Sequence, residues 1–354
     1  MMKKIFVLTT LLILSALSKA QENQFYTDAY QTLDNMLTDK QSYSFKTAVF
    51  SVENAYYQGK LNTEELNRKI LFLTKFCNQL TVNRKLQYSE KDEATVNKYA
   101  SIYTIMCQAT PVIVGKDTLK YKPFTYDFED VFGHKELSNL FVSKLLNTQK
   151  GNCNSMPYLY KIIAEELGVD ANLTLAPNHI YIKHNIKSIG WFNTELTSGI
   201  FPQDSWLMAS GYIHLDAIQN GVFMKALNNK ESLALLLIDL ANAYERSYPE
   251  NDGSFSLKCA KRAIQVHPYL ANALILQTET HKKQFQRLMK EQNTKDIQSI
   301  LSNPKAKELF DWMNKEYAHI HKIGYRSMPK EMYLDWLVSL KTERSKYEDT
   351  RLQK

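Results

Sequence analysis

The chain opens with one short apolar stretch. Residues 3–4 are lysines, residues 5–17 are almost all apolar, and Ser18 and Ala20 supply small side chains ahead of a polar segment. This order is typical of a cleavable secretory signal. The stretch is shorter than the roughly 20 residues that a membrane-spanning helix needs. We therefore expect residues 1–20 to be a signal peptide, the protein to be exported (periplasmic or secreted), and no stable membrane anchor to remain after cleavage.

Helical periodicity governs the next segment. From residue 21 to about residue 80, apolar residues recur along one face, which predicts helices. A polar stretch over residues 81–98 predicts a loop followed by an exposed helix. Residues 99–128 combine β-branched and aromatic side chains with a turn-like stretch around Gly115, which predicts a short strand or hairpin. We assign residues 21–118 to an N-terminal helical region.

The residues around Cys153 predict a helix that begins directly after this cysteine. Proline is tolerated in the first turn of a helix, where backbone N–H groups have no helical partner, so Pro157 places the start near Asn154. Gly168 suits the cap at the other end. The partial positive charge of a helix N-terminus favours a thiolate, so Cys153 is a candidate nucleophile. The apolar face of this helix consists of Met156, Leu159, Tyr160, Ile163, Ala164 and Leu167.

Alternating polarity after this helix predicts a small antiparallel sheet. Its strands are expected at residues 171–176, 179–184 and 191–197. His184 stands at the end of the second strand, and we expect it at a solvated turn. The sheet and the preceding helix together predict an α+β core over residues 119–209.

The sheet could supply a base for the thiol. A turn centred near Lys187 would place His179 opposite Glu195, with Cβ atoms about 5 Å apart. A register shifted by two residues would place Asn193 opposite His179 instead. In either register a polar side chain would orient the imidazole, so that His179 could act as the base for Cys153.

Helical patterns continue from Ser210 to the end of the chain. A leucine-rich stripe over residues 233–244 is expected in the core. The helices that follow resemble a tetratricopeptide helix pair, of which about one and a half units fit the period. We assign residues 210–342 to a C-terminal helical, tetratricopeptide-like region and residues 343–354 to a charged tail. The small and helix-breaking residues at the expected positions are Ala260, Ala263 and Pro268.

Composition narrows the classes of function. Hydrophobic residues make up 44% of the 354 residues, which is sufficient for a substantial core. The formal net charge of +7 falls to +4 without the three lysines of the expected signal, and basic residues are interleaved with acidic ones. We therefore expect no nucleic-acid partner. His319 and His321 lack the cysteine or carboxylate spacing of a metal site, so neither a metal nor a cofactor is expected.

The four cysteines form no recognisable framework. Their spacing fits neither a compact set of disulfides nor a paired-cysteine metal motif. Cys77, Cys107 and Cys259 are therefore expected to be small buried hydrophobic residues. If Cys153 is catalytic, at most one disulfide can form among the other three.

Three segments together resemble the transglutaminase-like superfamily, which is related to papain in fold. They read GNCNSMPYLYKIIAEELG at residues 151–168, APNHIYIKH at residues 176–184 and WFNTELTSG at residues 191–199. The W-x3-E-x-T run in the third segment resembles the W-x3-D-x-T run of that family, so Glu195 stands where an aspartate is usual. Asn193 is the alternative, because related thiol enzymes use asparagine to orient the histidine.

The resemblance covers roughly residues 120–285 and is closest in kind to bacterial members that join such a core to tetratricopeptide-like helices. It implies a helix-rich α+β fold and acyl transfer through Cys153, His179 and either Glu195 or Asn193. The implied substrate is a peptide or protein amide, with hydrolysis and acyl transfer both open. The alternative is a catalytically inactive member whose cleft or C-terminal helices bind a protein partner. An unrelated helical scaffold would not bring the thiol and the imidazole together.

Overall fold

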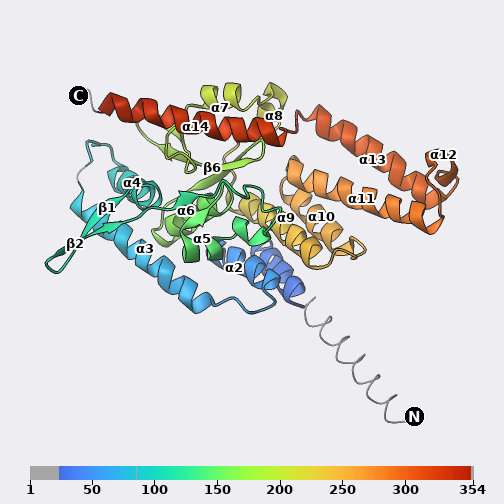
Figure 1. Cartoon of the computed structure of the whole chain (residues 1–354), viewed down its shortest axis with the longest axis horizontal. Helices are drawn as coiled ribbons and strands as arrows, with labels where there is room; N and C mark the ends of the chain where they lie inside the picture. The colour runs from blue at the N-terminus through green and yellow to red at the C-terminus, as the bar shows by residue number, and fades with distance from the viewer. Residues whose placement is uncertain (1–23, 85, 352–354) are drawn as a thin grey trace, which may run out of the picture.

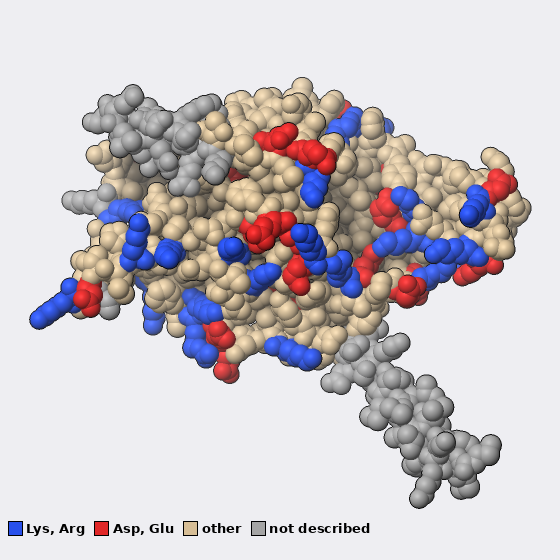
Figure 2. All heavy atoms as spheres, in the orientation of Figure 1, with Lys and Arg blue, Asp and Glu red and all other residues tan. Residues whose placement is uncertain are grey.

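The structure, a computed structural model, describes residues 24–84 and 86–351. The expected signal peptide at residues 1–20 lies outside the described residues. Within the described part, no helix is both long enough and apolar enough to cross a membrane. On the face shown in Figure 2, Lys and Arg are interspersed with Asp and Glu.

The protein is a helix-rich α+β protein, as its periodicity predicts (Figure 1). A short 3₁₀-helix, η1 (Leu137–Leu140), precedes α5. The helices are residues 24–37, α2 (Phe45–Tyr56), α3 (Thr63–Asn83), α4 (Glu93–Cys107), α5 (Val142–Thr148), α6 (Ser155–Glu166), α7 (Asp204–Ser210), α8 (Leu215–Gln219), α9 (Asn229–Ser247), α10 (Ser254–Val266), α11 (Ala271–Glu291), α12 (Ile297–Ile300), α13 (Pro304–Lys322) and α14 (Lys330–Arg351).

The strands form three small sheets. The central one is antiparallel in the order β5-β6-β7, and α6 packs against β5 and β6. A separate hairpin and a short parallel pair lie outside this sheet. The strands are β1 (Thr110–Val114), β2 (Asp117–Tyr121), β3 (Thr125–Tyr126), β4 (Lys150–Gly151), β5 (Asn172–Ala176), β6 (His179–Ile186) and β7 (Gly190–Thr194).

The register between β6 and β7 differs from the expected one by two residues. Lys183 lies opposite Asn193, so neither Glu195 nor Asn193 faces His179 across the ladder. Gly190 sets this register, because its φ of +74° places it in the left-handed region at the end of the turn. The strand also ends early, since β7 stops at Thr194 and Glu195 instead pairs with Ile200 in an isolated bridge.

The segment expected to be a strand or hairpin contains both a helix and a hairpin. The hairpin is β1–β2, and its turn contains Gly115, as the sequence predicts. Residues 99–107, however, belong to α4. The side chains of Ile102, Ile105 and Met106 are fully buried in the core. Burial of one helical face therefore overrides the strand preference of the β-branched residues.

The C-terminal helices pack in sequence, α9 against α10, α10 against α11, and α11 against α13. The last helix, α14, then returns across the top of the central sheet near α7 (Figure 1). Residues 343–351 are part of α14, so the expected start of a charged tail falls inside a helix.

One continuous hydrophobic core joins these parts. It includes buried residues from the first helix, the central sheet, α9 to α11, and α14. The N-terminal helix is tied to α9 by Tyr26, whose hydroxyl donates to the carbonyl of Ala243 at 3.0 Å. A second, smaller cluster joins α11, α12 and α13, and consists of Phe285, Ile300, Ala306 and Met313.

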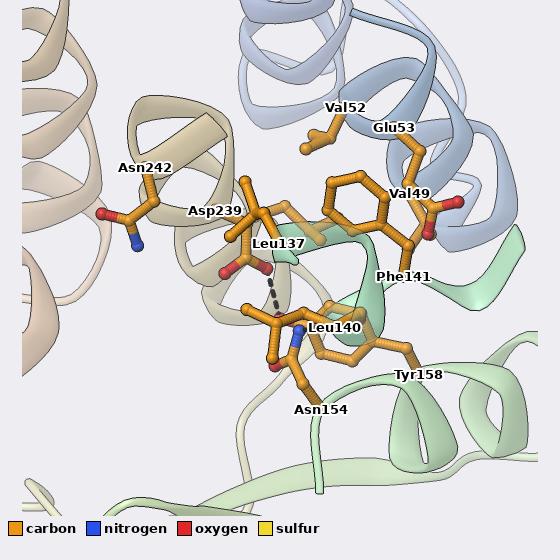
Figure 3. A pocket seen from close by; sticks show the side chains of 11 residues that line it. Val49, Val52, Glu53, Leu137, Leu140, Phe141, Asn154, Tyr158, Asp239 and Asn242 are labelled. Carbon is orange, nitrogen blue, oxygen red and sulfur yellow. Dashed lines mark hydrogen bonds between the residues drawn. The ribbon is translucent and has the colours of Figure 1, made fainter. Parts of the chain in front are cut away.

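A small hollow of about 30 Å³ lies between α2, α6 and α9 (Figure 3). Two carboxyl groups, of Glu53 and Asp239, line it, and the Tyr158 hydroxyl donates to Asp239 at 2.7 Å. Glu53 accepts hydrogen bonds from the backbone N–H groups of Val142 and Ser143 and so caps α5. Burial raises the pKa of Glu53 to about 7 and that of Asp239 to about 6.

Candidate functional site

Cys153 lies directly before the first turn of α6, where the sequence predicts it. The helix begins at Ser155 with Asn154 at its N-cap position. The side-chain oxygen of Asn152 accepts hydrogen bonds from the backbone N–H groups of Asn154 at 2.9 Å and Ser155 at 3.2 Å. Asn152 thus satisfies donors that the helix start leaves unpaired and fixes the backbone around the thiol.

His179 is the first residue of β6 and is completely buried as a side chain. Its Nε2 atom lies 2.5 Å from Oε2 of Glu195, whose side chain is 1% exposed. The other carboxylate oxygen of Glu195 accepts a hydrogen bond from the backbone N–H of Thr197 at 2.7 Å. Glu195 pairs with Ile200 across the turn at residues 196–199, and its side chain reaches the imidazole although the two residues are not paired across the sheet.

The second imidazole nitrogen faces the thiol and a tyrosine of the last helix. The hydroxyl of Tyr333 lies 3.1 Å from Nδ1 of His179 and donates to Sγ of Cys153 at 3.2 Å. The interaction with His179 also lowers the pKa of the Cys153 thiol. Trp336, one turn further along α14, packs edge-on against the imidazole with ring centroids 4.8 Å apart. The last helix therefore covers the thiol, and Cys153 is 8% exposed.

A second tyrosine reaches the thiol from β3. The hydroxyl of Tyr126 lies 3.4 Å from that of Tyr333, and Tyr126 is among the groups that lower the pKa of Cys153. Burial raises the pKa of both phenols well above the ordinary value. Both hydroxyls therefore stay protonated at neutral pH and can act as hydrogen-bond donors to a negative sulfur.

The electrostatics favour a thiolate and an imidazolium. Burial raises the pKa of Cys153, but hydrogen bonding and charge from His179, with the bond from Tyr333, lower it below the ordinary value. Burial likewise lowers the pKa of His179, but Glu195 and Cys153 outweigh this and raise it to about 10. A proton is therefore held more strongly on the imidazole than on the sulfur, as a nucleophilic cysteine requires.

Asn193, the alternative orienting residue, does not contact His179. Its side-chain nitrogen donates to the carbonyl of Pro202 and to Asp204, each at 2.8 Å. The two-residue change of register places Asn193 beside Lys183, further along the sheet from His179. The expectation that Asn193 could orient the imidazole is therefore wrong for this structure, and Glu195 occupies that position.

His184 is not at a solvated turn, contrary to expectation. Its side chain is buried, stacks on Tyr99 with ring centroids 3.9 Å apart, and bonds the Tyr160 hydroxyl at 3.0 Å. Burial lowers its pKa to about 3, so the ring stays neutral. The strand β6 extends to Ile186, which keeps His184 inside the sheet rather than at its end.

The remaining cysteines belong to helices α3, α4 and α10. All four cysteines are buried and carry free thiols. Burial raises the pKa of Cys77 to about 12 and that of Cys259 still further. Within the described residues, no group of three or more His, Cys, Asp or Glu side chains could hold a metal ion. His319 and His321 therefore belong to no such group.

Three residues of the site carry no local signal that would have identified them. Tyr333 and Trp336 belong to a helix that lies 180 residues beyond Cys153, and Tyr126 stands in a two-residue strand. Asn152, in contrast, had a readable signal, because asparagine is favoured just before a helix.

No protein-family model, no curated protein sequence and no solved structure matches the chain. The function must therefore be argued from the geometry of the site.

Proposed function

We propose that this protein is an exported, transglutaminase-like cysteine hydrolase or acyltransferase that acts on peptide or protein amide bonds. The observation that carries the proposal is the buried group of Cys153, His179 and Glu195. The Tyr333 hydroxyl contacts both Sγ of Cys153 and Nδ1 of His179, and Nε2 of the same imidazole lies 2.5 Å from the carboxylate. The thiol also stands at the start of a helix, where partial positive charge stabilises a thiolate. Residues 119–209 would form the transglutaminase-like core of this enzyme.

In the proposed reaction, the thiolate of Cys153 attacks the amide carbonyl carbon, and a sulfur–carbon bond forms. The tetrahedral intermediate collapses as the carbon–nitrogen bond breaks, and the His179 imidazolium protonates the leaving amine. Water or another amine then attacks the thioester, and His179 accepts its proton. The acyl group is released and the thiol is restored. Glu195 keeps the imidazole in position and stabilises its positive charge throughout.

Negative charge develops on the carbonyl oxygen in both tetrahedral intermediates. The backbone N–H of Cys153 at the start of α6 is one candidate donor. Tyr126 is a candidate for a second donor, because its hydroxyl stays protonated and lies 3.4 Å from the Tyr333 hydroxyl that bonds the sulfur. Tyr333 occupies the remaining space beside Sγ, so a substrate carbonyl can approach only after α14 shifts.

Alkylation by iodoacetamide tests the proposal. We expect Cys153 to react faster than Cys259 at neutral pH, because a thiolate is the reactive form and burial keeps Cys259 protonated. His179→Ala should slow alkylation of Cys153 by about tenfold or more, which is the effect of about one pKa unit. The rates are measured by peptide mass spectrometry. Equal rates for the two cysteines, unchanged by His179→Ala, would rule out an activated thiol.

The second candidate function is a catalytically inactive, transglutaminase-like protein that binds a protein partner through its cleft or its C-terminal helices. The observation in its favour is the Tyr333 hydroxyl, which contacts both the sulfur and the imidazole and closes the site. An inactive protein would keep Cys153 unreactive even after the tyrosine is removed. The two functions are therefore distinguished by the reactivity of Cys153 in a Tyr333→Ala variant.

A further inference from the structure

A hollow of about 740 Å³ is lined in part by Tyr126, the residue of β3 that contacts Tyr333 at the candidate site. Its volume falls within the roughly 300–1,000 Å³ that is usual for ligand sites. Segments from several parts of the fold line it, namely residues 107–109, residues 123–126, Phe128, residues 196–199 and Leu337 of α14.

Three residues that line the hollow lie close to the catalytic residues in the structure or along the chain. Tyr126 lines it, and its hydroxyl lies 3.4 Å from that of Tyr333, which donates to Cys153. Thr197 lines it and donates its backbone N–H to Glu195 at 2.7 Å. Leu337 stands one helical turn after Tyr333 on α14. A molecule in the hollow would therefore contact Tyr126, whose hydroxyl is one contact away from the Tyr333 hydroxyl that bonds the sulfur.

The lining determines what the hollow could accept. None of the described residues that line it carries a charged side chain, and its apolar residues include Phe124, Phe128 and Leu337. Phe128 is 52% exposed, so apolar area is still available for burial. A charged side chain would lose its hydration here without gaining a partner, which disfavours acidic and basic occupants.

One lining side chain lacks a hydrogen-bond partner. Ser198 is 5% exposed, and its hydroxyl is closed off from solvent and has no partner among the described residues. A buried hydroxyl without a partner is unfavourable, so such groups are commonly satisfied by a ligand or a water molecule. A peptide amide supplies both a donor and an acceptor for this hydroxyl.

We propose that this hollow is the substrate site and binds an extended, uncharged peptide segment with apolar side chains. One amide of this peptide bonds to the Ser198 hydroxyl after that side chain turns toward the hollow. The proposal rests on the proposed function only in treating the occupant as the substrate of Cys153. Substrates with Phe or Leu near the reacting amide should therefore be preferred over substrates with Lys or Glu at the same positions.

Binding to a Cys153→Ala variant tests the proposal without turnover. The probe is the capped peptide acetyl-Gly-Phe-Gln-Leu-Ala-Gly-amide, measured by titration calorimetry against a version with Glu in place of Phe and Leu. We expect the neutral peptide to bind more tightly. Adding Ala109→Trp, which fills the hollow from an exposed position, should weaken binding by about tenfold or more. Ser198→Ala should weaken it by about threefold to tenfold through one lost hydrogen bond.

Ala318→Trp is the matched control, because Ala318 is exposed on α13 and does not line the hollow. It should leave the affinity unchanged. Equal affinity for the two peptides, no binding, or no effect of Ala109→Trp would overturn the proposal. A hollow that instead receives a second copy of the chain would leave the peptide unbound and give a concentration-dependent dimer in sedimentation.

The outcome for the hollow can be separated from the outcome for the enzyme. Peptide binding with an unreactive Cys153 would retain the hollow as a peptide site and reject the enzyme. A reactive Cys153 without peptide binding would retain the activated thiol and reject the hollow.

Discussion

The carboxylate of Glu195 controls the charge of two other residues. It is buried against the imidazole of His179, where the effective dielectric constant is low and opposite charges interact strongly. The imidazolium that it stabilises in turn favours the thiolate of Cys153. The reactivity of the sulfur should therefore depend on a carboxylate that is not in direct contact with it.

Glu195→Gln should move the onset of Cys153 alkylation to higher pH by about one unit or more. The neutral amide no longer raises the pKa of His179, so the imidazolium is lost at lower pH and the thiol pKa rises. The measurement is the pH profile of iodoacetamide alkylation at Cys153. Glu308→Gln, at an exposed position on α13, is the control and should leave the profile unchanged. Matching profiles for the wild type and Glu195→Gln would contradict the proposed role of Glu195.

At the scale of elements, α14 is the part that closes the site. Tyr333 bonds the sulfur and the imidazole, and Trp336 packs on the imidazole and donates its indole N–H to Ser210 at 3.1 Å. The start of the helix is held by Asn178, whose side-chain nitrogen donates to the carbonyl of Met328 at 2.7 Å. Access to the thiol therefore depends on how firmly this helix is bound.

Tyr333→Ala should accelerate alkylation of Cys153 by about tenfold, because it removes the group that occupies the approach to the sulfur while Trp336 still anchors the helix. The lost hydrogen bond works in the opposite direction by about 1 kcal/mol, so the net change measures steric closure. Tyr317→Ala is the matched control, since Tyr317 is 40% exposed on α13. Slower or unchanged alkylation would mean that α14 does not limit access.

Another contact between elements depends on pH. Glu53 of α2 is 3% exposed and caps α5 through Val142 and Ser143. Burial raises its pKa from the ordinary 4.5 to about 7, so the folded state binds a proton more tightly than the unfolded chain does. The contribution of Glu53 to the free energy of unfolding is therefore greatest below the pKa that Glu53 has in the unfolded chain. It falls as the pH rises from 4.5 to about 7.

This shift predicts that the free energy of unfolding falls by about 3 kcal/mol over that range on account of Glu53. Glu53→Gln should make the pH dependence shallower, because an amide does not ionise. Asp239, whose pKa is raised to about 6, acts in the same direction and leaves a residual slope. Urea unfolding between about pH 5 and about pH 8 provides the measurement. A slope identical to that of the wild type would contradict this account, and Glu308→Gln again serves as the control.

At the scale of the whole molecule, the continuous core argues for one cooperative unit. Cys77 of α3 and Cys259 of α10 are both completely buried in the same hydrophobic cluster. α3 belongs to the N-terminal half of the chain and α10 to the C-terminal half, and the central sheet and α9 join them. The regions that the sequence distinguishes therefore share one interior.

Urea should expose Cys77 and Cys259 to alkylation at the same midpoint. Leu237→Ala, at a fully buried position in α9, should lower both midpoints together by removing about 3 kcal/mol of stability. The control is Leu215→Ala, because Leu215 is 61% exposed. Two separate midpoints, or a shift of only one by Leu237→Ala, would show that the N-terminal and C-terminal helices unfold independently.

The sequence by itself determined the features that depend on short spacing. The start of α6 after Cys153, its glycine cap at Gly168 and the β1–β2 turn at Gly115 were all predicted correctly. Each depends on residues within about one turn or one hairpin of each other. Side-chain periodicity and backbone restrictions act at that range, so the pattern is readable without knowledge of the fold.

Only the tertiary structure decided which surfaces meet. The register of β7, the burial of His184 and the placement of Asn193 on Asp204 all depend on packing between segments. The contact of Tyr333 with Cys153 joins residues 180 positions apart. Local periodicity states which face of a helix or strand is apolar, but it does not state which partner covers that face. That choice depends on the complementarity of the whole core, which decides what lies beside the sulfur.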